Sequence, residues 1–403
     1  MTVGVHEATT LRPLSGHVPS LDGVRGVAIL LVMLCHFSFA EPFPIPGLHF
    51  ALNTLSTGVD LFFVLSGFLI TGILLDSKET ENYYRNFYAR RILRIFPLYY
   101  LAVVLLAFVA PRLTVFRAFD GVQEAFLNRW WLMAYGANLT PLITNRFVGW
   151  VGHFWSLSVE EHFYFLWPVV VARLPRTSLI KLCLALPVVG FLSRVALMLA
   201  SNHNIAVYVF TPCRMDGLVM GSLIAATIRG PLDAPALARL SRRILPIAGL
   251  SLVGVHVFLH LGRLQIVTEL LASPVAALFY GCFLFVVLTL PAGGYGAKLI
   301  SSSPLRFLGL YSYGIYVFHV PLLNQLWARG VNVYLREHLR YALAGSLVFM
   351  MICFTASILI AVTSYHLYEK HFLRLKRYFR RPRERRAAAW EAAQSPEVAA
   401  TSS

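Results

Sequence analysis

The segment that decides the class of this protein runs from residue 24 to residue 39 and reads VRGVAILLVMLCHFSF. It is almost wholly apolar, yet it carries Arg25 and, eleven positions later, His36. An ionisable side chain inside a bilayer costs roughly 2.5–3.5 kcal/mol on insertion scales, so its presence there indicates a function. Since an α-helix rises about 1.5 Å per residue, the two side chains lie roughly 16 Å apart along the axis. We expect the arginine near one face of a membrane and the imidazole well inside it.

The composition of the whole chain is that of a membrane protein. Of the 403 residues, 57% are hydrophobic and only 13% are charged, whereas soluble proteins carry about 25% charged residues. The net charge of +16 comes from basic residues between apolar runs and near the C-terminus, where the positive-inside rule accounts for them. They do not form one basic face with interleaved aromatic residues, which argues against nucleic-acid binding. The five cysteines are isolated, so we expect small core residues and no metal site.

We predict an all-α polytopic integral membrane protein with about ten transmembrane helices. About 20 apolar residues cross a bilayer once, and such runs lie near residues 21–39, 55–75, 93–110, 153–172, 180–200, 211–228, 244–261, 266–290, 307–327 and 341–366. An even number of crossings puts both termini on one side. Lysines and arginines in every second connection place that side in the cytoplasm. The stretch 112–150 then forms an outer connection, in which the apolar piece 130–137 is too short to cross and is expected to be re-entrant or interfacial. The alternative is that it crosses, and every later span would then be inverted.

This topology divides the chain into three parts. Residues 1–19 form a cytoplasmic N-terminal segment, 20–370 form the membrane domain, and 371–403 form a basic cytoplasmic tail that is predicted to be disordered. No internal repeat of the kind found in many transporters is evident.

The first layer of polar residues lies at the predicted cytoplasmic side. It contains Arg25, Arg91 and Arg94. Arg91 and Arg94 are three positions apart, so they are neighbours on one helical face. Guanidinium groups bind phosphate bidentately and keep their charge, so this face is suited to a phosphate ligand. Anchoring by the positive-inside rule explains the same residues equally well.

The second layer lies deeper in the predicted membrane. Its members are His36, Glu160, Glu161, Arg214, Asp216 and His319. A histidine beside a carboxylate is equipped to deprotonate a hydroxyl group. The structural alternative is that these groups only pair with neighbouring helices. Arg214 and Asp216 are two positions apart and cannot face each other on a helix, so each needs a partner from another span.

A further conspicuous stretch contains Asp60 and, six positions later, the pair Ser66-Gly67. Small residues in a membrane helix let another helix approach closely, so this pair favours tight packing over ligand binding.

Six motifs in series resemble those of the membrane acyltransferase-3 family, and together they extend from about residue 20 to residue 370. They are the segment from Ser20 to His36 with its R-x(10)-H spacing, the segment from Asp60 to Ile70, the R-x-x-R pair Arg91 and Arg94, WSLSVEE at 155–161, RMD at 214–216, and YGIYVFH at 313–319. Each motif alone is weak, but the ordered series is specific. Family members with an appended esterase-like domain exist, and we expect this chain to be the membrane-only form.

The resemblance implies an enzyme that transfers an acyl group, commonly acetyl, from cytoplasmic acyl-CoA to a sugar hydroxyl of a polysaccharide, glycolipid or other glycoside. It implies His36 as the catalytic histidine, Glu160 as its supporting carboxylate, and Arg25, Arg91 and Arg94 as ligands of the CoA phosphates. Glu161, Arg214, Asp216, His319 and Asp60 are candidates for supporting the acceptor or the oxyanion.

The implied cellular setting is a bacterial cytoplasmic (inner) membrane. Acyl-CoA is expected as co-substrate, with no metal and no tightly bound cofactor. The lipid bilayer and the carbohydrate acceptor are the other partners. Both direct transfer and a covalent acyl-histidine are compatible with this chemistry. The competing functions are a transporter or flippase of polysaccharide or lipid-linked sugar, and a non-catalytic assembly scaffold.

Overall fold

The computed structural model describes residues 18–40, 47, 51–52, 54–200, 204–231, 233–261, 265–291 and 293–379. Most of the predicted N-terminal segment and of the predicted disordered tail lies outside these ranges. Across the described ranges the regular structure is helical, with no strand. The all-α prediction is therefore confirmed.

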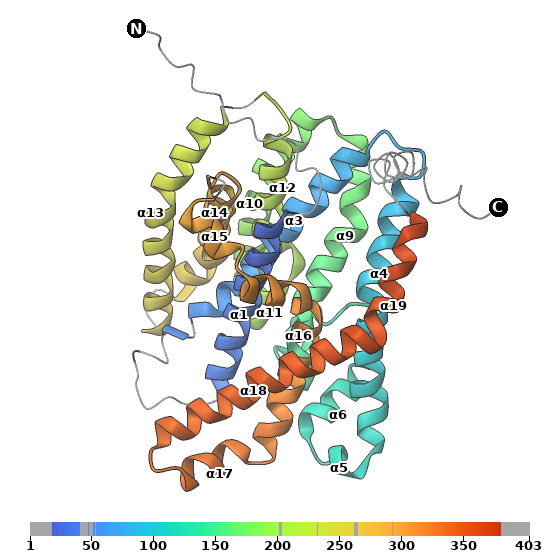
Figure 1. The fold of residues 1–403 in the computed structure, drawn as a ribbon, viewed down its shortest axis with the longest axis vertical. Coiled ribbons are helices and arrows are strands. Elements are labelled where there is room, and N and C mark those ends of the chain that lie inside the picture. The colour runs from blue at the N-terminus through green and yellow to red at the C-terminus, as the bar shows by residue number, and fades with distance from the viewer. Residues whose placement is uncertain are drawn as a thin grey trace, which may run out of the picture.

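Ten longer helices form the body of the molecule (Figure 1), and each overlaps one of the predicted apolar runs. They are α1 (Pro19–Ala40), α3 (Gly58–Ser77), α4 (Tyr83–Val103), α9 (Trp155–Arg173), α10 (Arg176–Ala200), α12 (Met215–Thr227), α13 (Ala234–His260), α14 (Gln265–Leu288), α16 (Ser303–Ala328) and α18 (Ala342–Ser364).

The helical segments that could cross a bilayer number seven, judged by length and apolar composition within the described part of the chain. Helices α9, α12 and α16 are not among the seven. Helix α12 has only 13 residues, which span roughly 20 Å. The protein is thus a polytopic membrane protein, while the count of ten crossings stays a prediction.

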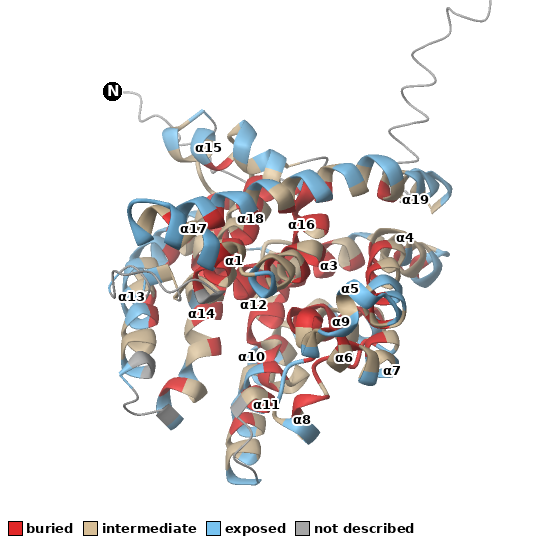
Figure 2. Ribbon diagram, turned by 90° about the horizontal axis from the view of Figure 1, so that it is seen from below, coloured by how far each residue is buried: buried red, intermediate tan, exposed pale blue. Residues whose placement is uncertain are grey.

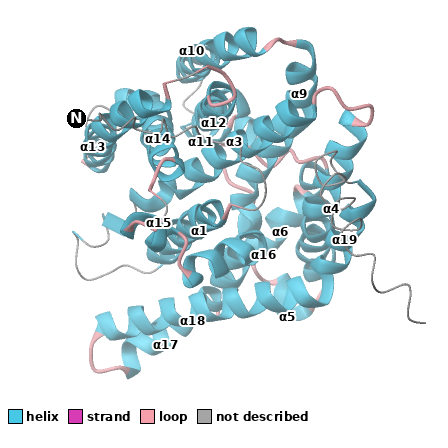
Figure 3. Ribbon diagram, turned by 45° about the horizontal axis from the view of Figure 1, so that its top comes forward, coloured by secondary structure: helices cyan, strands magenta, loops and turns pink. Residues whose placement is uncertain are grey.

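Four helices, α1, α3, α12 and α16, lie at the centre of the bundle, and the other long helices surround them (Figure 3). Burial follows this arrangement, because buried residues concentrate on the central helices while α13 and α17 (Val331–His338) are largely exposed or half-buried (Figure 2). A lipid-facing apolar surface is expected of the outer helices in a bilayer.

Glycine allows the central helices to touch through their backbones. A Cβ atom added at Gly67 of α3 would lie 1.9 Å from the carbonyl oxygen of Leu218 in α12, and one at Gly221 would lie 1.9 Å from that of Val64. Any larger side chain would force these helices apart. The predicted packing role is confirmed for Gly67.

The stretch 112–150 forms only short helices beyond the far end of α4, where α5 (Thr114–Arg117) and α6 (Asp120–Leu127) are seen at the bottom of Figure 1. The apolar piece 130–137 contains most of α7 (Arg129–Met133), a helix of five residues. The Tyr99 hydroxyl of α4 donates to the carbonyl of Leu132 at 2.7 Å, and the Tyr135 ring stacks on that of Tyr99 at 4.1 Å. The piece therefore packs against α4 and does not form a helix long enough to cross.

Basic residues gather at the opposite end of the bundle. Arg229 pairs with Asp76 at 2.8 Å, and the Lys78 ammonium donates to the carbonyl of Leu174 at 2.7 Å. The guanidinium of Arg90 donates to the carbonyl of Phe379 at 3.1 Å. The ends of α3 and α9 and the last described residue thus lie at the same end as the start of α4. That this end faces the cytoplasm stays a prediction.

Candidate active site

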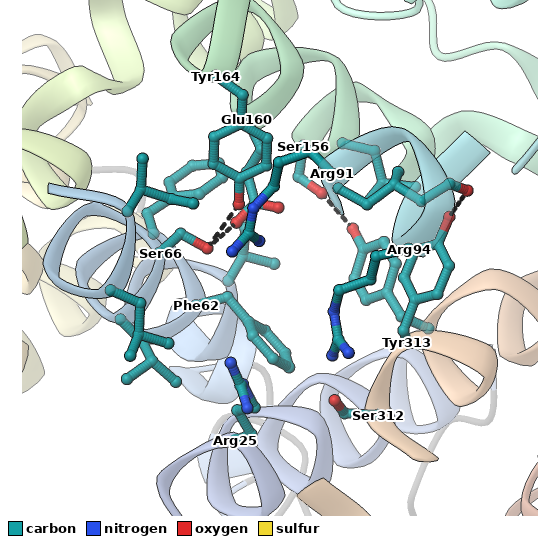
Figure 4. Close-up of a pocket in the computed structure, with 18 residues that line it drawn as sticks. Arg25, Phe62, Ser66, Arg91, Arg94, Ser156, Glu160, Tyr164, Ser312 and Tyr313 are labelled. Carbon is teal, nitrogen blue, oxygen red and sulfur yellow. Dashed lines mark hydrogen bonds between the residues drawn. The ribbon is translucent and has the colours of Figure 1, made fainter. Parts of the chain in front are cut away.

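A cavity opens where α1, α3, α4, α9 and α16 meet, and Figure 4 shows the side chains that line it. The empty space within it, including the part open to solvent, is about 810 Å³. Four charged residues line it, namely Arg25, Arg91, Arg94 and Glu160. The tertiary structure thus brings together four of the predicted site residues. Arg91 and Arg94 share one helical face, as predicted.

The three guanidinium groups reach the cavity from two helices. Arg25 stands in the second turn of α1, where Asp22, one turn earlier, pairs with it at 3.0 Å. The Arg25 side chain keeps 29% of its surface exposed. On α4, the Arg91 guanidinium lies 5.6 Å from the centre of the Tyr164 ring and 5.9 Å from that of Phe87. Such cation–π contacts restrict its direction.

The geometry favours an anionic ligand. In Figure 4 the guanidinium groups of Arg25, Arg91 and Arg94 all face the open centre of the cavity. Among the described residues, the charged groups that line it include a single carboxylate, that of Glu160. Convergent guanidinium groups recognise the oxygens of a phosphate with paired, charge-assisted hydrogen bonds.

Glu160 is held on the cavity wall by a short chain of hydrogen bonds. The Ser66 hydroxyl donates to Glu160 Oε1 at 2.6 Å, and the Tyr164 hydroxyl donates to Ser66 Oγ at 3.0 Å. Tyr164 lies one helical turn after Glu160 on α9, while Ser66 reaches in from α3 (Figure 4). The sequence indicated only a packing role for Ser66 and none for Tyr164, because their contact with Glu160 depends on how two distant helices meet.

His36 lies apart from the residues that line the cavity, and its side-chain partner is a second histidine. His36 Nδ1 is 3.0 Å from His319 Nε2, and the ring centres are 4.9 Å apart. His319 is completely buried. The structure therefore pairs His36 with His319, whereas the resemblance implied Glu160 as its support. The catalytic roles of His36 and Glu160 stay predictions.

Tyr316 connects the histidines to the cavity. Its side chain lines the cavity, and its backbone carbonyl faces His319 Nδ1 at 2.8 Å and His153 Nε2 at 3.0 Å. Its hydroxyl donates to the carbonyl of His153 at 2.8 Å. His153 was not among the predicted site residues, and the one signal for it in the sequence is its position two residues before the WSLSVEE motif.

Two buried ion pairs occupy a separate region between α3, α10 and α12. Arg214 Nη2 lies 2.8 Å from Asp60 Oδ1, and Arg194 Nη1 lies 2.6 Å from Asp216 Oδ2. This confirms that Arg214 and Asp216 pair with other helices. None of these residues lines the cavity. The sequence did not indicate a role for Arg194, because an isolated arginine in the apolar run of α10 gives no sign of its partner.

The last predicted site residue, Glu161, follows Glu160 on α9 but does not line the cavity. Its Oε1 atom is buried and has no hydrogen-bond partner among the described residues. The described residues also contain no group of three or more His, Cys, Asp or Glu side chains that could hold a metal ion.

The relatives of the chain are known acyltransferases. Peptidoglycan O-acetyltransferase OatA of Listeria monocytogenes is 28% identical over an alignment of 339 positions, and the match covers 78% of this chain and 51% of that protein. O-acetyltransferase OatA of Staphylococcus aureus is 26% identical over an alignment of 365 positions, and the match covers 83% of this chain and 56% of that protein. The chain thus spans about half the length of these curated relatives. No solved structure matches it.

The family of the chain follows from a match to a family model, which covers a larger share of the chain than either relative does. The sequence model of the acyltransferase domain family covers residues 18–366, a stretch that includes all the long helices and every candidate site residue described above. The chain therefore belongs to the membrane acyltransferase-3 family.

Proposed function

We propose that this protein is a membrane O-acyltransferase that moves an acetyl group from acetyl-CoA to a hydroxyl group of a bacterial envelope polysaccharide. The observation that carries the proposal is the convergence of Arg25, Arg91 and Arg94 on one cavity. The names of the relatives make peptidoglycan the first acceptor to test.

The cavity is proposed as the site of the CoA phosphates. Coenzyme A carries a pyrophosphate and a ribose phosphate, and three guanidinium groups supply enough charge and enough donors for such a polyanion. The extended arm that carries the thioester is then directed along α1 toward His36. The roughly 16 Å of helix between Arg25 and His36 is comparable to the length of that arm. Because acyl-CoA is a cytoplasmic compound, we place the basic end of the bundle at the cytoplasmic face.

The proposed reaction needs one base and one reaction centre shielded from water. His36 accepts the proton of the acceptor hydroxyl as the oxygen attacks the thioester carbonyl. The carbon–sulfur bond breaks as the ester forms, and the departing thiolate takes the proton from the imidazolium, so the enzyme returns to its starting state. Glu160, held by Ser66, balances the arginine charges beside the bound donor.

The test is acetyl transfer by the purified protein in lipid vesicles, with labelled acetyl-CoA and peptidoglycan fragments as acceptor. Arg91→Ala removes a cavity-lining guanidinium. Arg90→Ala is the matched control, because the neighbouring Arg90 does not line the cavity and donates to the carbonyl of Phe379.

Loss of charge-assisted hydrogen bonds worth about 1.5–3 kcal/mol predicts roughly 10- to 150-fold weaker acetyl-CoA binding for Arg91→Ala. Arg90→Ala should bind close to wild type, and His36→Ala should bind donor but transfer no label. Equal binding by Arg91→Ala and wild type would contradict the proposed donor site. Movement of glycan across the vesicle without acetylation would support a transporter instead.

A further inference from the structure

We propose that His319 is a positioning residue for His36, which it fixes as the neutral tautomer with hydrogen on Nδ1. The Nε2 atom of His36 is then the unprotonated nitrogen that accepts the hydroxyl proton. The inference rests on the proposed function for its chemistry, but the tautomer itself follows from the hydrogen bonds alone. It replaces the carboxylate support that the sequence led us to expect.

The first step concerns the His319 ring. Its Nδ1 atom lies 2.8 Å from the carbonyl oxygen of Tyr316 and 3.1 Å from that of Ile315. A carbonyl oxygen can only accept, so Nδ1 must carry the hydrogen. In a neutral imidazole the other ring nitrogen is then an acceptor. His319 Nε2 therefore presents a lone pair.

The second step concerns the tautomer of His36, which depends on that of His319. His36 Nδ1 lies 3.0 Å from the Nε2 lone pair of His319. It also lies 3.1 Å from the carbonyl oxygen of Val32, which again can only accept. Both neighbours need a donor at Nδ1, so the hydrogen of neutral His36 sits there and Nε2 is unprotonated.

The surroundings of His319 explain why its ring does not adopt the other tautomer. His319 is fully buried, and the carbonyl of Tyr316 that holds it also accepts from His153 Nε2 at 3.0 Å. A carbonyl oxygen has two lone pairs, so the carbonyls of Tyr316 and Ile315 can accept from the His319 ring in addition to their bonds within the helix.

The arrangement also suits the charge that forms during the reaction. When His36 Nε2 takes up a proton, the ring becomes a cation whose Nδ1–H already points at an acceptor. The hydrogen bond to His319 then becomes charge-assisted, and such bonds are roughly twice as strong as neutral ones. Since His319 is neutral and already oriented, no group has to turn as the charge develops.

The kinetic test compares two replacements of His319. His319→Leu keeps the approximate volume and removes the acceptor, whereas the side-chain oxygen of His319→Gln can still accept from His36. We expect His319→Leu to lower kcat on the order of 10- to 100-fold, as loss of a supporting residue does at other sites, with the KM for acetyl-CoA unchanged. His319→Gln should recover most of this loss. The exposed His338 supplies the control His338→Leu, which should leave kcat unchanged.

The tautomer is measured separately, without any substrate, by solid-state ¹⁵N NMR of histidine-labelled protein in lipid. The His36 signals are identified by their absence in His36→Ala. A protonated Nδ1 and an unprotonated Nε2 on His36 would support the inference, and a protonated Nε2 would overturn it. An equal kcat for wild type and His319→Leu would also overturn it. If wild type shows the expected tautomer but transfers no acetyl group, the proposed function fails while the assigned tautomer stands.

Discussion

Replacing Gly67 by alanine should separate two closely packed central helices, α3 and α12. The new Cβ would lie 1.9 Å from the carbonyl oxygen of Leu218 and 2.7 Å from its carbonyl carbon. Real Cβ contacts are essentially never shorter than 3.0 Å, so the backbones of α3 and α12 must move apart by about 1.1 Å at this point. Backbone cannot rotate away as a flexible side chain can. Overpacking of this kind costs about 1–3 kcal/mol.

The displacement should also reach the cavity. Ser66 precedes Gly67 and donates to Glu160 at 2.6 Å, so a shift of α3 lengthens that bond. On the same face of α3 as Gly67, Thr71 donates to Ser222 of α12 at 2.8 Å. We expect weaker acetyl-CoA binding together with the lower stability.

The matched control is Gly254→Ala in α13, because a Cβ there has no atom within 4 Å. Alanine in an open helical position is stabilising by roughly 0.5–1 kcal/mol relative to glycine. The assay is reversible unfolding in mixed detergent micelles, with the free energy of unfolding compared for both variants. Gly221 lies across the same interface. In the Gly67→Ala background, Gly221→Ala should lower the free energy of unfolding by less than it does alone, since the helices are already apart. Equal stability of Gly67→Ala and Gly254→Ala would refute the reasoning.

Two further predictions concern buried polar contacts. Asp60→Ala leaves the Arg214 guanidinium buried without its partner at 2.8 Å, so this variant should lower the free energy of unfolding by about 3–5 kcal/mol. The double variant Asp60→Ala with Arg214→Met should recover most of this loss in the same unfolding assay. A double variant as unstable as Asp60→Ala alone would contradict this prediction. Ser66→Ala removes the hydroxyl that donates to Glu160 and should weaken acetyl-CoA binding by about 1–3 kcal/mol. Tyr164→Phe, which removes only the hydrogen bond to Ser66, should cost less in the same titration.

The sequence alone determined the class of the protein and much of its site. Apolar runs of bilayer length located the long helices, because the cost of burying polar backbone in lipid leaves helices as the main solution. Helical periodicity put Arg91 and Arg94 on one face, and the ordered motifs led to the family. The small residue at Gly67 indicated a close helix contact, which the structure contains.

The partners of the polar residues were decided only by the tertiary structure. His36 meets His319, which is 283 positions away, and Arg214 meets Asp60, which is 154 positions away. Arg194, unremarkable in its apolar run, holds Asp216. The physical reason is that helical geometry relates residues only three or four positions apart. Which faces of distant helices meet depends on the packing of the whole bundle, where close glycine contacts and buried charges must be satisfied at the same time.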